Sequence, residues 1–435
     1  MRMAAVGAGV GVVLADSSVV ILALPAVLSQ FHATITSVAW VLVAFNLVMA
    51  LLAVPAAYAS RWFTSGRVLA GGLVVLAAAS AVAAAAGSLD VLLAARCIQA
   101  VGGAAAVCAG LDVLPALAGS ESRAAAIWVT CGALGAAVGP AVGGILTELV
   151  SWRAIFLIQV PIALGVAAAA PRGQRAVGPR AGRPHLGANL ALGLVSAALT
   201  AALFLVVLLL IDGYRYTPVA AAVVVTVMPL AAVPAGRLGR RVRSPRIRAA
   251  SGALLIAGGL ASLGLLPAAG WHWIVVPEVM IGAGLALTLS ALTEAALSGR
   301  SRQGIHGGWT VAARHAGVVL GLLILTPIFT ADLQTQQLRA EDSATSILIT
   351  APLSITTKLH LADQLERRLV GGSATRVPDL APVFHGSTGA LAQVGHEILD
   401  QVARAVTAAF RRSFLLAGLL ALLALLPIGL GRLDL

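Results

Sequence analysis

Residues 187–211 read GANLALGLVSAALTAALFLVVLLLI, a run that contains no charged side chain. A helix needs about 20 predominantly apolar residues to cross the hydrocarbon core of a bilayer. Further apolar runs, bounded by charged residues, glycine or proline, occupy residues 4–29, 36–59, 67–86, 90–117, 124–149, 154–170, 217–237, 248–268, 271–297, 304–330 and 411–431. The sequence therefore predicts an all-α polytopic membrane protein with twelve transmembrane helices.

The composition of the chain supports this class and excludes others. Of its 435 residues, 59% are hydrophobic and only 11% are charged, whereas soluble domains carry about 25% charged residues. An ordinary soluble enzyme, a disordered chain and a nucleic-acid-binding protein are therefore excluded. The three cysteines, Cys97, Cys108 and Cys131, lie inside apolar runs. Their positions predict neither a disulfide framework nor a metal site.

The net charge of +12 comes mostly from arginines in the short gaps between apolar runs. With the N-terminus in the cytoplasm, seventeen arginines fall in cytoplasmic segments, and the short outer loops hold only Arg153 and Arg215. Basic residues are enriched in the cytoplasmic loops of membrane proteins. We therefore expect a multi-pass protein of the cell membrane, in contact with membrane lipids, with both termini in the cytoplasm.

Two polar stretches organise the chain. Residues 171–186 are rich in Arg, Gly and Pro, and we interpret them as a cytoplasmic basic linker between N-terminal (1–170) and C-terminal (187–435) six-helix bundles. Residues 331–410 are too polar to span a membrane and too long for a simple turn. Leucines at helical spacing and a later apolar stripe predict an exterior helical hairpin here, whose second arm extends the last helix. This insert is either a packed lid or a docking surface for a partner.

Asp16 lies near the middle of the first predicted helix, among apolar neighbours. An ionisable side chain at the centre of a spanning helix costs about 2.5–3.5 kcal/mol and is usually functional. Proton coupling requires a buried carboxylate that takes up a proton on one side and releases it on the other, so Asp16 is the first candidate for this role. The alternative is a static ion pair with Arg96 that only holds helices together.

Arg96 and Gln99 are the polar residues that face the same side of the helix at 90–117. Arg96 stays charged at every accessible pH and needs a partner or a wet cavity. Gln99 lies about one turn further along the same face. Together they are expected to hold a carboxylate or to steer a chain of water molecules.

The second half of the chain offers weaker candidates. Glu278 lies in the helix that corresponds to helix 4 in a six-plus-six arrangement, so it is a second candidate for a proton or cation site. For Arg314, in the helix at 304–330, a structural role explains its position as well as a functional one does. His315 beside it is a weaker candidate for a functional residue than Arg314. The predicted proton-coupling residues are Asp16, Arg96 and Glu278. The predicted cavity-lining residues are Asp16, Gln99, Glu278 and Arg314.

Asp112 lies 16 residues after Arg96 in the same predicted helix. At about 100° per residue it faces away from Arg96. It lies near the cytoplasmic end of this helix, where Arg67 or Arg61 is placed to pair with it. We therefore expect Asp112 to form a salt bridge at an inner gate.

Residues 135–144 read GAAVGPAVGG. Gly135, Gly139 and Gly143 recur every four residues and form one flat stripe that lets another helix approach closely, and Pro140 loosens the backbone there. With Gly144, these residues predict an element that takes part in conformational change. The alternative is ordinary helix packing.

Several of these segments resemble motifs of the major facilitator superfamily, specifically its drug/proton antiporter branch, which usually has fourteen helices. The similar segments are LADSSVVILALP at 14–25, RCIQAVG at 96–102, GAAVGPAVGG at 135–144, SWRAIFLIQVP at 151–161 and AARHAG at 312–317. The resemblance implies two six-helix bundles that rock about a midplane cavity lined by helices 1, 4, 7 and 10. It further implies that Asp16 carries the proton, that Arg96 tunes it, and that the glycine motif marks an exporter.

Three features depart from the family pattern. The loop that normally reads G-x-L-A-D-R-x-G-R-R is AYASRWFTSGR at 57–67 and lacks the acidic residue. Asp112 matches the helix-4 acid of the same charge cluster, so an Asp112–Arg67 pair is expected to remain as a reduced latch. The two extra central helices of the branch are absent. The insert at 331–410 is long, and some relatives with extended outer helices move lipids.

The sequence therefore favours proton-coupled efflux, by antiport, of hydrophobic or amphiphilic small molecules, as in multidrug resistance. Export of an endogenous lipid or secondary metabolite with the help of the insert is the alternative. A transport-dead scaffold that docks partners through 331–410 is less favoured. There is no catalytic constellation, nor a phosphate-binding glycine loop followed by lysine. We accordingly expect no enzymatic activity, no metal and no cofactor, with the proton gradient as the energy source and a monomer as the working unit.

Overall fold

The structure is a computed structural model that describes residues 2–171, 182–267, 270–297, 300, 302–370 and 380–430. Every regular element in these ranges is a helix. The helices are α1 (Arg2–Ile21), α2 (Leu24–Gln30), α3 (Ile35–Ala59), α4 (Ser65–Ala84), α5 (Leu89–Ala118), α6 (Glu121–Leu149), α7 (Ala154–Ala169), α8 (Leu186–Leu208), α9 (Pro218–Val225), α10 (Val227–Gly239), α11 (Pro245–Gly264), α12 (Trp271–Leu297), α13 (Gln303–Thr350), α14 (Ile355–Val370), α15 (Gly389–Leu423) and α16 (Leu425–Leu430). A π-helical turn, η1 (Leu209–Gly213), extends α8, and η2 (Ala381–Val383) is a short 3₁₀ turn.

The described helices match the predicted spans. Eleven of them, counting closely joined pairs as one, are long and apolar enough to cross a membrane, and α7 adds a shorter apolar helix of 16 residues. Several begin at a serine or threonine whose hydroxyl accepts a hydrogen bond from an otherwise unpaired N–H of the first turn. These caps include Thr34, Thr64, Ser88 and Ser120. The predicted polytopic all-α fold class is confirmed.

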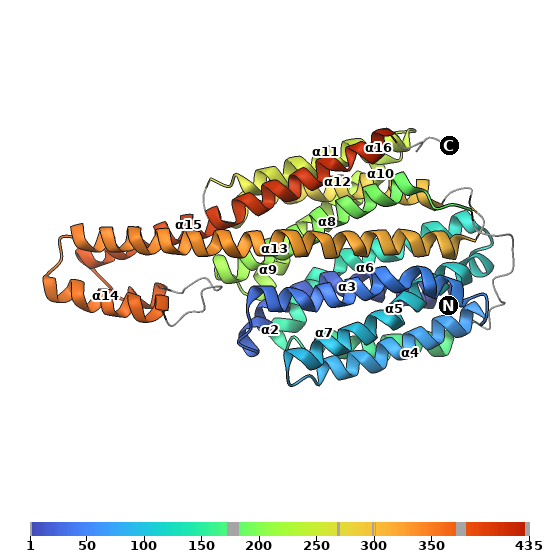
Figure 1. Cartoon of the computed structure of the whole chain (residues 1–435), viewed down its shortest axis with the longest axis horizontal. Coiled ribbons are helices and arrows are strands. Elements are labelled where there is room, and N and C mark those ends of the chain that lie inside the picture. The colour runs from blue at the N-terminus through green and yellow to red at the C-terminus, as the bar shows by residue number, and fades with distance from the viewer. Residues whose placement is uncertain are drawn as a thin grey trace.

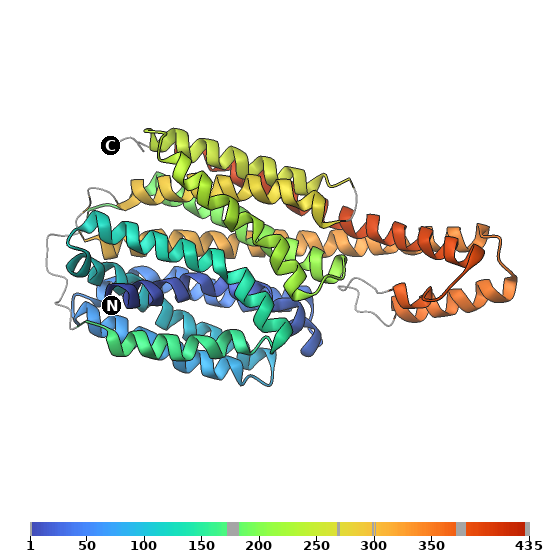
Figure 2. The same cartoon turned by 180° about the vertical axis from the view of Figure 1, so that it is seen from behind.

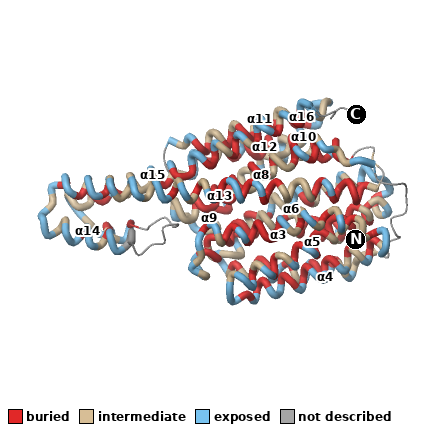
Figure 3. The backbone as a smooth tube through the Cα atoms, viewed as in Figure 1, coloured by how far each residue is buried: buried red, intermediate tan, exposed pale blue. Residues whose placement is uncertain are grey.

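The helices form an elongated bundle with two distinct ends (Figure 1). Helix α1 begins and α16 ends at one end, which we call the terminal end. The insert projects from the opposite end, which we call the hairpin end. Buried residues concentrate where helices face one another, and exposed residues follow the outer surfaces (Figure 3). Large apolar side chains such as Leu51, Val223 and Leu230 are among the exposed ones, as expected where the surrounding solvent is lipid.

The helices fall into two groups that meet along a few elements. Helices α1–α7 pack on one another, as do α8, α11, α12, α15 and α16. Helix α13 packs against α3 and α5 of the first group and against α8 and α15 of the second, and α6 contacts α9. Most of the predicted linker, residues 172–181, lies outside the described residues. The predicted domain division at 171–186 therefore stays a prediction.

Three predicted spans are interrupted, and the one predicted at 411–431 breaks at Ala424, between α15 and α16 and three residues before Pro427. The first span breaks at Leu22–Ala23, and α2 restarts with Pro25 in its first turn. The span predicted at 217–237 breaks at Thr226, between α9 and α10. Proline lacks the N–H that would continue the hydrogen-bond ladder, and Pro25 and Pro229 lie just after these breaks.

The insert is helical as predicted, but one predicted boundary is wrong. Helix α13 continues through Thr350 instead of ending at residue 330, and stops just before Pro352, where a proline disfavours helix in the residue before it. Helix α14 and the first part of α15 pack against this extension around a separate small core. That core consists of Ala344, Leu348, Ala351, Leu361, Leu365, Leu380, Phe384, Val394 and Ile398. The extension keeps its helical form because its apolar stripe is covered by these partners.

Candidate functional site

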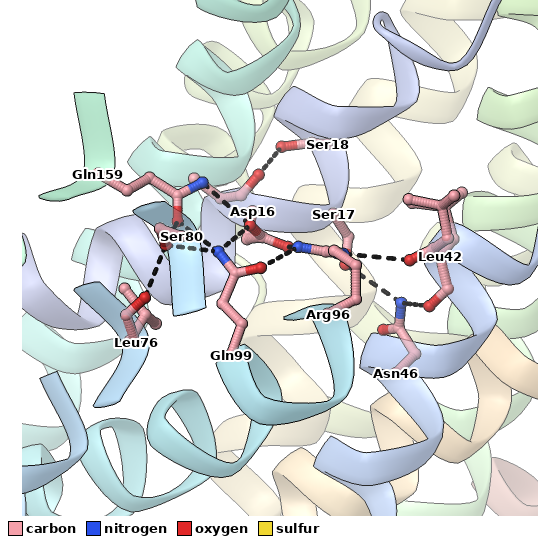
Figure 4. A network of polar contacts seen from close by, with 12 residues as sticks. Asp16, Ser17, Ser18, Leu42, Asn46, Leu76, Ser80, Arg96, Gln99 and Gln159 are labelled. Carbon is pink, nitrogen blue, oxygen red and sulfur yellow. Dashed lines mark hydrogen bonds and ion pairs between the residues drawn. The ribbon is translucent and has the colours of Figure 1, made fainter. Parts of the chain in front are cut away.

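Asp16 lies in α1 with only 1% of its surface exposed. Its Oδ2 atom is 2.6 Å from Nη1 of Arg96 on α5, and the Arg96 side chain is fully buried. Figure 4 shows the two side chains pointing toward each other between the helices. The structure thus brings together the two predicted residues in a dry ion pair, which is stable only when further hydrogen bonds satisfy both groups.

The Arg96 guanidinium has two hydrogen-bond partners besides Asp16 and also lies over aromatic rings. Its Nε donates to the carbonyl oxygen of Val41 on α3 at 3.1 Å, and Nη1 donates to Gln99 Oε1 at 2.7 Å. The guanidinium carbon lies 4.3 Å from the centre of the Phe45 ring, within the range of a cation–π contact. Arg96 Nη2 is buried without a hydrogen-bond partner among the described residues. Arg96 is therefore held in place by its partners, while its Nη2 atom has no acceptor among the described residues.

Two glutamines complete the surroundings of Asp16. Gln159 of α7 donates from Nε2 to Asp16 Oδ1 at 3.0 Å, and Gln99 Nε2 approaches the same oxygen at 3.4 Å. Gln99 Nε2 also donates to Gln159 Oε1 at 2.8 Å and to Ser80 Oγ at 2.9 Å. Arg96 and the amides of Gln99 and Gln159 all donate toward Asp16, so the network fits a carboxylate that only accepts. We name Asp16, Ser80, Arg96, Gln99 and Gln159 the Asp16 network.

Sequence reasoning did not identify Gln159 and Ser80 as site residues. Both are neutral, so neither carries the charge that makes a residue conspicuous inside an apolar span. The available signal was a glutamine inside an otherwise apolar span, in the motif at 151–161. A buried polar side chain in such a span needs a partner, and here the partner is the site itself.

Helix α13 reaches the neighbourhood of Asp16 through His315. The His315 Nδ1 atom lies 2.5 Å from Asn46 Oδ1, and Asn46 Nδ2 donates to Ser17 Oγ at 3.3 Å. Ser17 is the chain neighbour of Asp16. Arg314, predicted to line the cavity, lies beside His315 but forms no hydrogen bond or ion pair with the Asp16 network among the described residues. His315 is therefore better placed than Arg314 to link the two helix groups.

Glu278 lies apart from the Asp16 network, in α12. It is 1% exposed, and neither carboxyl oxygen has a hydrogen-bond partner among the described residues. Gly259 of α11 packs closely on the backbone next to it, since a Cβ on Gly259 would lie 2.8 Å from the carbonyl oxygen of Pro277. A buried polar group with no partner requires an explanation such as a proton, an ion or a ligand.

The glycine stripe of α6 packs directly on α1. A Cβ atom on Gly135 or Gly143 would collide with the backbone carbonyl of Gly11 or Val19, respectively. One on Gly139 would collide with the Ser18 hydroxyl. The predicted close approach is thus found, and the helix that approaches is the one that carries Asp16.

Pro140 and Gly144 occupy other positions on α6. Pro140 lies inside α6 without ending it. Gly144 faces α9 of the other helix group, and a Cβ there would meet the Ala222 side chain and the Pro218 carbonyl. Gly144 therefore lies where the two helix groups touch, near the hairpin end.

Asp112 lies at the terminal end, where the prediction of an Asp112–Arg67 pair is not met. Arg67 is exposed in the first turn of α4, and no ion pair joins these two described residues. Asp112 instead faces the backbone N–H of Gly304 and the charge of Arg302, at the start of α13. A helix N-terminus attracts a carboxylate through its unpaired N–H groups and its dipole, which explains the change of partner.

A second carboxylate makes a similar contact at the hairpin end. Glu148 Oε2, at the end of α6, accepts a hydrogen bond of 2.7 Å from the backbone N–H of Val219 in the first turn of α9. Each end of the bundle thus has an acidic side chain from the first helix group at the N-terminus of a helix from the second. Glu148 is not among the site residues predicted from the sequence.

Comparisons with known proteins agree with this architecture. The family model described as Major Facilitator Superfamily matches residues 6–322. The multidrug efflux pump LfrA of Mycolicibacterium smegmatis is 30% identical over 160 residues, which cover 36% of this chain and 32% of LfrA. The tetracenomycin C resistance and export protein of Streptomyces glaucescens is 30% identical over 162 residues, covering 37% of this chain and 30% of that protein. The chain thus spans about a third of the length of these curated relatives.

Solved structures show the same fold. A bacterial homologue of the human lysosomal transporter Spinster, inward-facing and unoccupied, superimposes with a TM-score of 0.66 at 16% identity, covering 98% of this chain and 97% of that one. Its inward-facing, occupied form gives a TM-score of 0.65, covering 98% and 95%. At this identity, the likeness concerns the fold alone.

Proposed function

The chain belongs to the major facilitator superfamily, and from this premise we propose that it is a proton-coupled exporter of hydrophobic or amphiphilic small molecules. Members of this family are membrane transporters and not enzymes, and efflux is the activity named for its two curated relatives. The observation that carries the proposal is the Asp16 network, a buried carboxylate paired with an arginine inside membrane-spanning helices. We further propose the cell membrane as its location, with both termini in the cytoplasm.

In the proposed cycle, Asp16 alternates between two protonation states. The ionised carboxylate accepts from Gln159 and pairs with Arg96. Protonation removes its charge and turns one oxygen into a donor, so the ion pair breaks and Arg96 shifts toward its other acceptors, Gln99 and the Val41 carbonyl. Glu278 serves as a second proton site, and Gln99, Glu278 and Arg314 face the substrate path.

The protonation change would then alter how the two helix groups pack against each other. Helix α1 carries Asp16 and lies against the glycine stripe of α6, where smooth surfaces allow small shifts. The contacts of Asp112 with α13 and of Glu148 with α9 would open in turn, which gives alternating access. The proton gradient supplies the energy, so no cofactor is needed, and a monomer suffices.

The test uses inside-out vesicles with an acidic interior. Wild type, Asp16→Asn and the control Asp90→Asn, which changes an exposed acid in the first turn of α5, are given a panel of lipophilic compounds. We expect at least one compound to collapse the pH gradient with wild type and Asp90→Asn. We expect Asp16→Asn to slow this collapse by about 100-fold or more, since the coupling group itself is removed. Equal collapse by Asp16→Asn and wild type would contradict proton coupling through Asp16.

The second candidate function is export of an endogenous lipid or secondary metabolite. The insert favours it, since this segment projects beyond the bundle and builds its own core. Cells that lack the protein would accumulate such a cargo, which lipid and metabolite profiling would detect. Removal of residues 345–400 should then weaken export only in part, whereas a docking scaffold should lose all activity.

A further inference from the structure

A pocket opens on the side of the first helix group, and we call it the side pocket. It lies between α6 and α7, with α1 as its floor, and has a volume of about 410 Å³. Figure 2 shows these three helices from behind, with α1 in dark blue between the teal α6 and the green α7. Small-molecule sites commonly measure about 300–1,000 Å³, so the side pocket has the size of a binding site.

The floor of the side pocket is formed where α1 and α6 are in close contact, so the pocket does not arise from poor packing. Gly11 of α1 and Gly135 of α6 both line it, and they touch so closely that a Cβ on Gly135 would collide with the Gly11 carbonyl. The glycines remove side chains from the floor, while the walls retain larger ones such as Leu134 and Ile158. The hollow therefore follows from where glycine stands in the sequence.

The inner wall of the side pocket belongs to the Asp16 network. Gln159 lines the pocket, is only 4% exposed, and donates its amide to Asp16 Oδ1 at 3.0 Å. Ala15, the chain neighbour of Asp16, lines it as well. Any molecule in the pocket would touch residues that are one contact away from the Asp16–Arg96 pair.

The chemistry of the lining specifies the occupant. None of the residues that line the pocket is charged, and all of them lie in apolar helices. The amide of Gln159 is already engaged with Asp16 and Gln99. The rim is formed by apolar side chains such as Val138, which is 53% exposed, so the pocket opens toward the hydrocarbon of the bilayer. A charged ligand would lose its hydration here without gaining a partner.

We propose that the side pocket binds a neutral, apolar small molecule that arrives from the bilayer, and that its occupancy acts on Asp16 through Gln159. The binding part of this inference needs only the pocket. The second part rests on the proposed proton-coupled function. An occupant that presses on the Gln159 side chain shifts the amide that donates to Asp16, and thereby changes how readily Asp16 takes up a proton.

The first experiment measures binding in proteoliposomes of the full chain. The probe is an uncharged aryl diazirine, cross-linked by light and mapped by mass spectrometry. We expect saturable labelling of α1, α6 and α7 that an unlabelled neutral hydrophobe displaces. Val138→Trp places an indole at the mouth of the pocket and should reduce saturable labelling about tenfold or more, because a blocked pocket forfeits most apolar contacts.

Val101→Trp is the matched control. Val101 is 45% exposed on α5, and both valines lie 17 residues from the terminal end of their helices, counted from Ala118 and from Glu121. It does not line the pocket, so its labelling should equal wild type. Val12→Phe, which fills the pocket from its floor, gives a second blocked variant where Val138→Trp does not fold. Labelling that never saturates, or that is equal in blocked and control variants, means that bulk lipid alone fills the hollow and overturns the proposal.

The second experiment separates the two parts of the proposal. Asp16→Asn should keep the saturable labelling, because Asp16 does not line the pocket, even though it abolishes proton-driven transport. In wild type the probe should change the rate of gradient collapse at least threefold, and in Val138→Trp it should not. If labelling is saturable but Asp16→Asn transports like wild type, the proposed function fails while the site stands. If labelling is saturable but the probe leaves the rate unchanged in a functional wild type, the link through Gln159 is overturned.

Discussion

Asp16 and Glu278 are both carboxylates with 1% exposure in spanning helices, one in each helix group, yet their surroundings are opposite. Asp16 has an arginine and two amides that donate to it. Glu278 has no hydrogen-bond partner among the described residues. A carboxyl without partners is stable in an apolar interior only in its neutral form, whereas the partners of Asp16 favour its charge. The two sites therefore differ in whether their neighbours supply hydrogen-bond donors to the carboxyl group.

The difference shows that burial alone does not define a proton site. What matters is which protonation state the neighbours stabilise. In the first helix group the neighbours are preorganised around a negative charge, so taking up a proton requires rearrangement. In the second, losing the proton requires a partner to arrive. In the proposed cycle, Asp16 is thus the site whose neighbours must rearrange before it binds a proton, and Glu278 is the site that needs a new partner before it releases one.

Breaking the Asp16 side of this comparison should have the largest effect. Arg96→Ala leaves the Asp16 carboxylate buried without its counter-charge, which costs about 3–5 kcal/mol of stability. Thermal unfolding in detergent should show a clear decrease in the midpoint temperature. The double variant Asp16→Asn/Arg96→Leu should recover much of this stability, since no unpaired charge remains.

The same double variant separates coupling from a purely structural ion pair. If the pair only holds helices together, restoring stability should restore transport. We expect transport to stay absent in the stabilised double variant. Recovery of transport there would assign Asp16 and Arg96 a structural role alone.

The sequence predicted part of this arrangement for physical reasons. The spans could be predicted from the apolar runs, because polar side chains are unfavourable in the hydrocarbon core of the bilayer. Asp16 and Arg96 stand out because buried charges are rare and must find partners. The role of Gln159 could not be predicted from the sequence. A neutral amide in a span indicates only that it has some partner, and which residue that partner is depends on how α7 is rotated against α1.

Contacts at helix ends were harder still to predict. The pairing of Asp112 depends on where α13 begins, and α13 begins beside residues whose positions are set by tertiary packing. Arg302, just before it, has a φ of 61°, a left-handed backbone conformation that no periodicity reveals. The charge pattern correctly singled out Asp112 but suggested the wrong partner, because the backbone N–H of Gly304 has no signal in a charge pattern and only the fold brings Arg302 near Asp112.

The contact that positions Asp16 offers the next test. Gly135→Ala forces a methyl group onto the Gly11 backbone, and overpacking of this kind costs about 1–3 kcal/mol. We expect lower thermal stability and slower transport, because α1 is displaced together with Asp16. Gly71→Ala is the matched control, since a Cβ at Gly71 on α4 meets nothing within 4 Å. It should be neutral or gain about 0.5–1 kcal/mol from its higher helix propensity. Equal stability of the two variants would show that the glycine contact does not position α1.

At Glu278, the substitution Glu278→Gln should reduce proton-driven transport while it leaves the stability of the protein nearly unchanged. Because no described partner is lost, we expect stability within about 0.5 kcal/mol of wild type. Proton-driven transport should fall about tenfold if this carboxyl carries a proton. Glu294→Gln is the control, as it breaks an ion pair with Arg248 of 2.5 Å without touching Glu278. A Glu278→Gln variant with unchanged transport at every pH would remove Glu278 from the proton path.

The smallest effects are expected at the two ends of the bundle, where a carboxylate contacts a helix N-terminus. These carboxylates have fewer partners than Asp16, but unlike Glu278 they do have a partner. Asp112→Asn and Glu148→Gln each remove a charge–dipole contact worth about 0.3–1 kcal/mol. In the proposed cycle these contacts close opposite ends, so the variants should shift the open–closed balance in opposite directions by about two- to fivefold. Cysteines introduced at the terminal end should react faster with a water-soluble maleimide in Asp112→Asn and more slowly in Glu148→Gln. The same direction of change in both variants would mean that the two contacts only stabilise the bundle and do not oppose each other as gates.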